Sequence, residues 1–210
     1  MSSQINETLK QHRLVPVIAL DDASQANPLA DALVAGGLPV AEVTFRTPAA
    51  LESIRLMAER GDLLVGAGTV LTTEQVDQAQ AAGAKFLVSP GFNPRVVSHA
   101  LAIGMPICPG VCTPSDVEQA IEHGLEVVKF FPAESFGGLS TLKAIAAPYR
   151  QMRFIPTGGI GPANVTDYLA FDRVVACGGS WMVKPALYAS GDFSGVEKAV
   201  REAVELVRST

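Results

Sequence analysis

The feature of this sequence that most constrains its fold is a repeated unit, in which a helical stretch ends in glycine and an apolar strand follows. Four copies read LVAGGLPVAEV, AQAAGAKFLVS, ALAIGMPICPG and AIEHGLEVVKF, with glycines at Gly37, Gly83, Gly104 and Gly124. A glycine just past a helix end supplies the left-handed cap that turns the chain into the next strand. The last three glycines lie 21 and 20 residues apart. That period fits one strand plus one helix, the smallest right-handed parallel crossover.

Eight apolar segments of strand length recur along the chain. They are LVPVIAL (14–20), VAEVTF (40–45), LLVGAG (63–68), KFLVSP (85–90), PICPG (106–110), EVVKFF (126–131), RFIPTG (153–158) and RVVACG (173–178). The stretches between them read as helices, several with a Ser, Thr or Asp cap, and a short helix precedes the first strand. Eight alternating units predict a single α/β domain over residues 1–210, a (β/α)₈ or TIM barrel. A doubly wound open sheet is the alternative.

Charge and composition argue against several classes of function. The chain has 16 Lys and Arg against 21 Asp and Glu, which argues against a nucleic-acid partner or an anionic membrane. The N-terminal MSSQINETLKQHR lacks the apolar core of a signal peptide, and no apolar run approaches the ~20 residues that cross a bilayer. Cys108, Cys112 and Cys177 form neither an even disulfide set nor a metal-ligand spacing. We therefore expect a metal-free protein of the reducing cytoplasm.

Two of the apolar strands carry charged residues. In VAEVTFRT, the alternation of a strand puts Glu42, Thr44 and Arg46 on one face. In LEVVKFFP, Lys129 stands alone among apolar residues. We place both charges toward the carboxyl ends of their strands, where barrel enzymes have their active sites. Burial disfavours the ammonium form of a lysine and so favours the neutral amine, which is the nucleophile of Schiff-base chemistry.

Each of these residues also has a structural alternative. Lys129 could extend past the strand end, or form a buried ion pair with Glu42. Glu42 is the candidate proton shuttle for imine chemistry, and its alternative is a helix cap or a surface carboxylate. Arg46 could hold a carboxylate through two hydrogen bonds. Thr69, in VGAGTV after the third strand, is equally a site residue or a cap for the helix that follows.

Two glycine pairs end the seventh and eighth predicted strands. Gly158 and Gly159 lie in FIPTGGIGPAN, and Gly178 and Gly179 lie in ACGGSW, where Ser180 follows. Barrels often bind phosphate at this position through loop amides and the N-terminus of a short helix. A single glycine pair is more often a turn, but two pairs on these two strands favour a phosphate site.

The segments together resemble the class I 2-keto-3-deoxy-6-phosphogluconate (KDPG) aldolases. GLPVAEVTFR resembles their glutamate motif and GLEVVKFFPAESFG their Schiff-base lysine motif. VGAGTVLT, SPGFNP, FIPTGGIGPAN and ACGGSW extend the resemblance over essentially the whole chain. It implies a cofactor-free lyase of the Entner–Doudoroff pathway that cleaves KDPG to pyruvate and glyceraldehyde 3-phosphate. Similar enzymes also cleave 4-hydroxy-2-oxoglutarate (KHG) to pyruvate and glyoxylate, and they are typically homotrimers.

The resemblance also implies a role for each matching residue. Lys129 would form the Schiff base, and Glu42 would be the general acid/base. The other implied substrate contacts are Arg46 and Thr69 at the pyruvyl carboxylate, Pro90 and Phe131 in the pocket wall, Thr157 near the substrate hydroxyls, and Gly159, Gly179 and Ser180 at the phosphate. One departure is Cys112 in PGVCTP, where relatives vary among small polar residues.

Three rival hypotheses have less support from the sequence. A metal-dependent aldolase needs clustered Asp, Glu or His ligands, which the predicted strand ends lack. A sugar-phosphate isomerase would not require a lysine inside the sixth strand. A non-catalytic phosphate-binding barrel would not need Lys129, Glu42 and Arg46 together.

Overall fold

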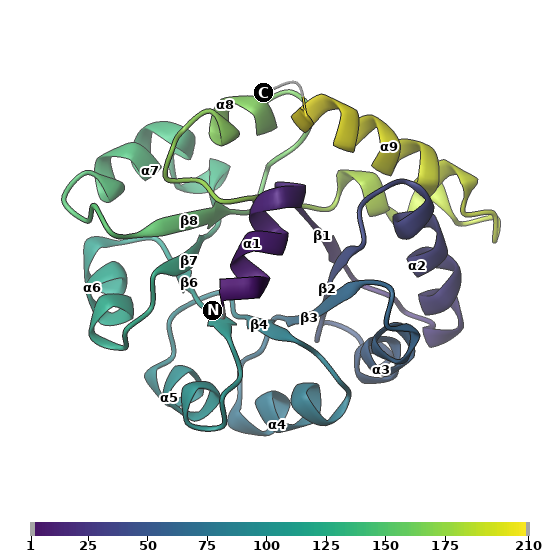
Figure 1. Ribbon diagram of the computed structural model, residues 1–210, viewed down its shortest axis with the longest axis horizontal. Coiled ribbons are helices and arrows are strands. Elements are labelled where there is room, and N and C mark those ends of the chain that lie inside the picture. The colour runs from purple at the N-terminus through teal and green to yellow at the C-terminus, as the bar shows by residue number, and fades with distance from the viewer. Residues whose placement is uncertain (1–2, 209–210) are drawn as a thin grey trace.

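A computed structural model describes residues 3–208, and its strands and helices alternate along the chain as the repeat predicts (Figure 1). The strands are β1 (Leu14–Ile18), β2 (Val40–Thr44), β3 (Leu64–Gly68), β4 (Phe86–Val88), β5 (Ile107–Cys108), β6 (Gly110–Val111), β7 (Val127–Phe130), β8 (Arg153–Pro156) and β9 (Cys177–Gly179). The α-helices are α1 (Ser3–His12), α2 (Ala26–Ala35), α3 (Ala50–Arg60), α4 (Thr73–Ala81), α5 (Pro94–Ala102), α6 (Pro114–Glu122), α7 (Gly138–Ala146), α8 (Val165–Leu169) and α9 (Ser194–Arg208). Short 3₁₀ helices are η1 (Ala23–Gln25), η2 (Glu134–Phe136), η3 (Trp181–Val183) and η4 (Pro185–Leu187).

The strands form a ring of parallel strands with the helices outside it (Figure 1). One row pairs in the order β5-β4-β3-β2-β1-β9, and a second in the order β6-β7-β8. Parallel bridges from Phe154 to Val174 and from Thr157 to Gly178 join the two rows at β8 and β9. At the other junction, β5 and β6 are two halves of one strand that Pro109 separates. The predicted (β/α)₈ barrel is therefore confirmed, and the open-sheet alternative is wrong.

The helix ends follow from the glycines and caps in the sequence. The four repeat glycines all have left-handed backbone, with φ of 87°, 91°, 76° and 72° for Gly37, Gly83, Gly104 and Gly124. Only glycine adopts this conformation without a steric penalty, so each helix ends there and the chain turns inward to the next strand.

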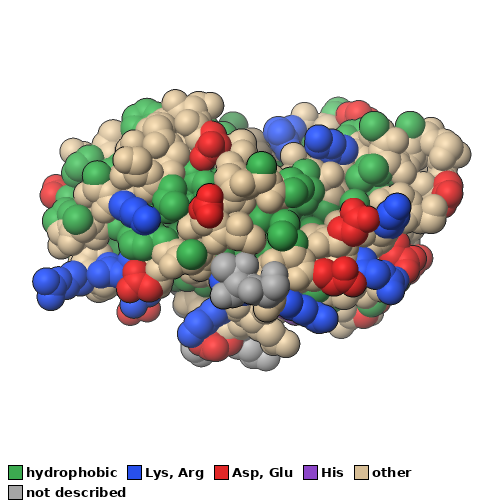
Figure 2. Space-filling model, turned by 90° about the horizontal axis from the view of Figure 1, so that it is seen from above, with side chains coloured by type: hydrophobic (Ala, Val, Ile, Leu, Met, Phe, Trp, Pro, Cys, Tyr) green, Lys and Arg blue, Asp and Glu red, His purple; other side chains and the backbone are tan. Residues whose placement is uncertain are grey.

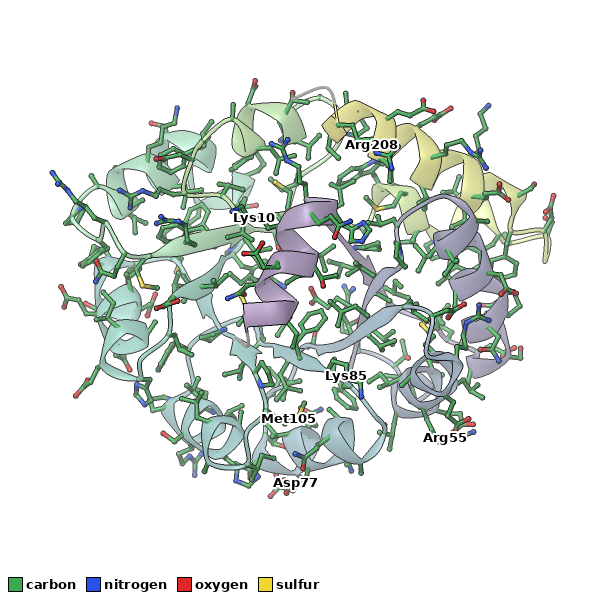
Figure 3. The ribbon with its side chains drawn as sticks, in the orientation of Figure 1. Lys10, Arg55, Asp77, Lys85, Met105 and Arg208 are labelled. Carbon is green, nitrogen blue, oxygen red and sulfur yellow. The ribbon has the colours of Figure 1, made fainter. Side chains whose placement is uncertain are left out.

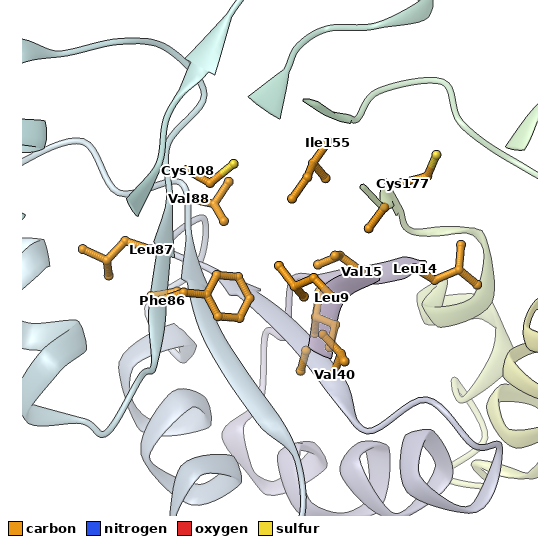
Figure 4. Packing of buried hydrophobic residues seen from close by; sticks show 14 of the residues in the cluster. Leu9, Leu14, Val15, Val40, Phe86, Leu87, Val88, Cys108, Ile155 and Cys177 are labelled. Atoms are coloured by element: carbon orange, nitrogen blue, oxygen red, sulfur yellow. The ribbon is translucent and has the colours of Figure 1, made fainter. Parts of the chain in front are cut away.

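The predicted N-terminal helix, α1, lies across the amino-terminal end of the barrel (Figure 1). Its Leu9 is fully buried and lies inside the ring near Val15 and Phe86 (Figure 4). The ring of Phe86 fits there because Gly66 on the next strand lacks a side chain: a Cβ at Gly66 would lie 2.3 Å from that ring. The carboxyl end of the barrel is therefore the end that remains for a site.

Arg55 and Asp77 lie near the outer rim of the molecule in Figure 3. Within residues 3–208, Glu42 and Lys129 are the only buried side chains that carry a charge. None of the helices in that same range is long and apolar enough to cross a membrane.

Candidate active site

An amine and a carboxylate meet in the centre of the barrel. Lys129 on β7 and Glu42 on β2 are 6% and 3% exposed, and Lys129 Nζ lies 3.5 Å from Glu42 Oε1. Lys129 therefore does not extend past the end of its strand, and that alternative is wrong. Glu42 is neither a surface carboxylate nor a helix cap, so its alternatives are wrong too. The buried ion pair, which the sequence left open, is present. Two charges that leave water need such a partner, and the same pair supplies a nucleophile and a proton acceptor in one place.

Glu42 lies deeper in the barrel than the sequence indicated. It is the middle residue of the five in β2 rather than a residue at the carboxyl end, and its register partner on β3 is Gly66. The space for its side chain comes from Gly68, where a Cβ would lie 2.3 Å from Glu42 Oε1. We did not predict Gly68 as a site residue. A small residue facing a buried charge on the neighbouring strand would have been the signal.

A small cavity of about 10 Å³ adjoins the pair on its inner side. It is lined by Leu9, Val15, Glu42, Phe86, Val88, Cys108, Lys129, Ile155 and Thr157. Such a volume holds about one water molecule, so the space between the ion pair and α1 has no room for a substrate. Burial raises the pKa of the Cys108 thiol to about 12, although the positive charge of Lys129 opposes the shift. The substrate must therefore approach from the carboxyl side, and Cys108 stays a neutral thiol.

Two of the predicted pocket residues lie beside the lysine. Lys129 Nζ is 5.1 Å from the centroid of the Phe131 ring, directly after β7. Thr157, directly after β8, is buried and lines the same cavity as Lys129. A Cβ on Gly178 would lie 2.2 Å from Thr157 Oγ1, so this glycine makes room for the threonine.

Arg46 and Thr44 form a hydrogen-bonded chain above Glu42. Thr44 Oγ1 donates to the carbonyl of Ile18 at 2.7 Å, and Arg46 Nε donates to Thr44 Oγ1 at 2.9 Å. The predicted common face of Glu42, Thr44 and Arg46 is consistent with these contacts. Because Nε is held, the guanidinium is oriented, and its terminal nitrogens form the fork that suits a carboxylate. Thr44 had no assigned role in the sequence analysis, although its alternation with Glu42 was visible.

Thr69 directly follows β3 and has φ of 56°, a left-handed backbone that is strained for a β-branched residue. The cap of α4 is Thr72, whose side chain accepts a hydrogen bond from the backbone N–H of Gln75. The alternative of Thr69 as a helix cap is therefore wrong. Strained backbone conformations are concentrated at functional sites, so this conformation favours Thr69 as a site residue.

Pro90 lies at the same end of the barrel as Thr69, two residues after β4. Its carbonyl oxygen would lie only 2.0 Å from a Cβ at Gly110, so the proline packs tightly on the neighbouring strand.

The two predicted glycine loops lie side by side, because the parallel bridge joins β8 to β9. Gly158 and Gly159 have left-handed φ of 100° and 79°. Gly179 is required for another reason: a Cβ there would lie 1.9 Å from the Trp181 ring. Ser180 is exposed and directly precedes η3, so the short helix expected after this loop is present.

The molecule is hollowed at the edge opposite α1, between two lobes (Figure 2). Apart from Glu42, in the middle of β2, the predicted site residues lie at or just after the carboxyl ends of strands. Lys129 contacts both Glu42 and the Phe131 ring, and Thr157 lines the same cavity as Lys129 and Glu42. Within the described range, no three His, Cys, Asp or Glu side chains gather closely enough to hold a metal ion. Metal-free chemistry remains a prediction.

The fold and this centre define a (β/α)₈-barrel enzyme that pairs a buried amine with a carboxylate. The family model for KDPG and KHG aldolases matches residues 5–199. The chain is 52% identical over 204 residues to 2-dehydro-3-deoxy-phosphogluconate aldolase of Treponema pallidum, covering 97% of each chain. It therefore belongs to the KDPG and KHG aldolase family.

Solved structures agree with this assignment. The KDPG aldolase of Zymomonas mobilis, solved with 3-phosphoglycerate, has a TM-score of 0.91 and 42% identity, over 98% of this chain and 97% of that one. The KDPG aldolase of Legionella pneumophila has a TM-score of 0.92 and 36% identity, over 96% and 98%. That structure holds pyruvate captured at low pH as a covalent carbinolamine intermediate.

Proposed function

We propose that this chain is a class I aldolase that cleaves KDPG to pyruvate and glyceraldehyde 3-phosphate, the aldol step of the Entner–Doudoroff pathway, and that also cleaves KHG to pyruvate and glyoxylate. The observation that carries the proposal is the buried Lys129 amine, 3.5 Å from the Glu42 carboxylate. Family membership supports it. The carbinolamine of the Legionella pneumophila enzyme supports it further, because this adduct forms when an amine adds to a ketone.

The first half of the reaction builds an electron sink. The neutral Lys129 amine attacks the C2 ketone of the substrate and forms a carbinolamine. Loss of water from the carbinolamine leaves a protonated imine between Nζ and C2. Glu42 Oε1, 3.5 Å from Nζ, is placed to take the proton that the Lys129 ammonium loses before this attack.

The second half breaks the carbon–carbon bond. Glu42, directly or through a water, takes the proton of the C4 hydroxyl, and the C3–C4 bond breaks as the aldehyde forms. The bonding electrons move into the imine and give an enamine. Protonation of the enamine at C3 and hydrolysis of the imine release pyruvate and restore Lys129. A single acid/base group in this position contributes about 10²–10⁴-fold to the rate.

The remaining residues bind and orient the substrate in this proposal. Arg46, held at Nε by Thr44, grips the pyruvyl carboxylate with the help of Thr69. Pro90 and Phe131 form the pocket wall, and Thr157 lies near the substrate hydroxyls. Gly159, Gly179 and Ser180 bind the phosphate through backbone amides and the Ser180 hydroxyl.

Steady-state kinetics of Ser180→Asp with both substrates test the proposal. A carboxylate at this position opposes the phosphate: at an effective dielectric of about 20, unit charges about 4 Å apart repel by about 4 kcal/mol. Solvent relieves part of that, but a tenfold loss needs only about 1.4 kcal/mol. We expect a large loss of kcat/KM for KDPG and a small one for KHG, which has no phosphate. Equal losses in a folded variant would remove the separate phosphate site and the preference for KDPG.

We also propose that residues 1–210 form one domain, a cytoplasmic enzyme that assembles as a homotrimer and needs no cofactor. The buried hydrophobic residues of the described chain form one cluster, which supports a single domain. The three cysteines are free, which suits a reducing compartment. The trimer rests on the family resemblance. Light scattering should give a mass three times that of the 22.0 kDa chain, and the mass of a monomer would contradict it.

A further inference from the structure

Glu134, in η2, connects the strand of Lys129 to the loop that contains Gly158 and Gly159. Its backbone N–H donates to the Gly158 carbonyl at 3.0 Å, and the N–H of Ala133 donates to the Thr157 carbonyl at 2.8 Å. A Cβ at Gly159 would lie 2.6 Å from both Cβ and Cγ of Glu134. The backbone of Gly159 therefore packs directly on the stem of the Glu134 side chain.

The carboxylate of Glu134 is held by a side chain from a different element. Tyr168 on α8 is 1% exposed, and its hydroxyl donates to Glu134 Oε1. Burial and the neighbouring Glu134 carboxylate raise the pKa of Tyr168. Its proton therefore stays on the hydroxyl, and the hydrogen bond to the carboxylate is available at every physiological pH.

The same loop is held on its other side by Asn164. Its Nδ2 donates to the Gly159 carbonyl at 3.1 Å, and its Oδ1 accepts from the N–H of Gly161 at 2.9 Å. Asn164 directly precedes α8, the helix that carries Tyr168. The loop is thus fixed between η2 and the start of α8, and the bond from Tyr168 to Glu134 joins those two supports.

We propose that Glu134 and Tyr168 are positioning residues that set the Gly158–Gly159 loop at the correct distance from Lys129, and so determine the affinity for phosphorylated substrates. The inference rests on the proposed function, in which KDPG is held at one end by Lys129 and at the other by this loop. A substrate bound at both ends requires a fixed separation between the two contacts. KHG is bound at the Lys129 end and has no phosphate, so it does not bind the loop.

Loss of the Tyr168 hydroxyl should weaken phosphate binding for an electrostatic reason as well as a geometric one. The Glu134 carboxylate is an anion beside a loop proposed to bind an anion. The bond from Tyr168 holds that carboxylate toward α8. Without the hydroxyl, the exposed carboxylate is free to turn toward the loop, where it repels the substrate phosphate.

Tyr168→Phe tests the inference, because it removes one oxygen and keeps the buried ring. We expect KM for KDPG to rise about fivefold, which corresponds to about 1 kcal/mol, while kcat stays within about twofold. KM for KHG should not change. The matched control is Tyr149→Phe, which removes a hydroxyl that donates to the Glu118 carboxylate at 2.9 Å on the outer surface. The control should alter neither KM.

Two variants of Glu134 complete the test. Glu134→Gln keeps an oxygen that accepts from Tyr168, so KM for KDPG should stay near that of the unchanged enzyme. Glu134→Ala removes both the acceptor and the side-chain stem on which Gly159 packs, and we expect the loss of this support to outweigh the loss of the negative charge, so that KM rises for KDPG alone. The inference is overturned if KM for KDPG is unchanged in both Tyr168→Phe and Glu134→Ala, or if KM rises equally for the two substrates. If Ser180→Asp still separates the substrates in that case, this inference alone fails. If the unchanged enzyme cleaves neither substrate, the proposed function fails with it.

Discussion

The fit between Gly68 and Glu42 makes Gly68→Ala a sharp probe of the site. The new methyl carbon would lie 2.3 Å from Glu42 Oε1, 2.7 Å from Cγ and 2.9 Å from Cδ. Gly68 is not one of the glycines with left-handed φ, so alanine fits the backbone without strain. The three atoms nearest to the new methyl group all belong to the Glu42 side chain, so the closest conflict is with the glutamate.

The size of the effect follows from these distances. An ordinary contact begins at 3.4 Å, so the carboxylate must move by about 1 Å. A misplacement of about 1 Å can cost about 10²-fold in rate, which is about 2.7 kcal/mol. We expect kcat for KDPG to fall by about that factor. Trapping of the pyruvate imine should persist, because Lys129 is unchanged.

The assay is steady-state release of pyruvate, with melting temperature measured on the same samples. Gly66→Ala is the matched control on the same strand, where the methyl would lie 2.3 Å from the Phe86 ring instead. Overpacking of this kind costs about 1–3 kcal/mol, so the control should melt earlier while kcat at a permissive temperature stays near that of the unchanged enzyme. A folded Gly68→Ala with normal kcat, or equal kcat losses in both variants, would refute the reasoning.

Three further predictions concern the chemistry and the thiols. Glu42→Gln should lower kcat by about 10²–10⁴-fold with a modest change in melting temperature, and near-normal turnover would contradict its proton-transfer role. Prolonged EDTA treatment should leave the rate unchanged, because an imine replaces the Lewis acid; a loss that Mg²⁺, Mn²⁺ or Zn²⁺ restores would favour a metal-dependent aldolase. Cys108 and Cys177 are buried and Cys112 is only partly buried, so a thiol reagent at pH 8 should label only Cys112 in the native protein and all three after denaturation. Rapid native labelling of Cys108 would contradict the closed barrel.

The barrel could be predicted because its signal is local and repeated. A cap glycine before each apolar segment specifies the turn from helix to strand, and the structure bears this out at Gly37, Gly83, Gly104 and Gly124. The division of the fifth strand at Pro109 was not predicted, because it depends on which neighbours each half pairs with. The eighth strand was predicted to begin at Arg173, whereas β9 begins at Cys177 and Val174 makes only an isolated bridge.

Lys129 and Glu42 could be predicted as site residues because a charge inside an apolar strand is costly to bury and is therefore rare. The residues that support this pair could not, since their roles depend on neighbours distant in sequence. Gly68 matters only because the Glu42 side chain of the neighbouring strand β2 occupies the space beside it, and Tyr168 matters because its hydroxyl donates to a carboxylate 34 residues away. Alternation along one strand makes Thr44 visible, but its bond to Arg46 depends on side-chain conformation.

The most direct test of the central claim is to locate the covalent adduct. The enzyme is incubated with pyruvate, reduced with borohydride, digested and analysed by mass spectrometry. We predict that the added mass lies on Lys129, in the peptide that contains VVKFFPAE, and that Lys129→Arg traps nothing because a guanidinium does not form the imine. An adduct on Lys143 or Lys184, or no adduct in an active enzyme, would contradict the assignment.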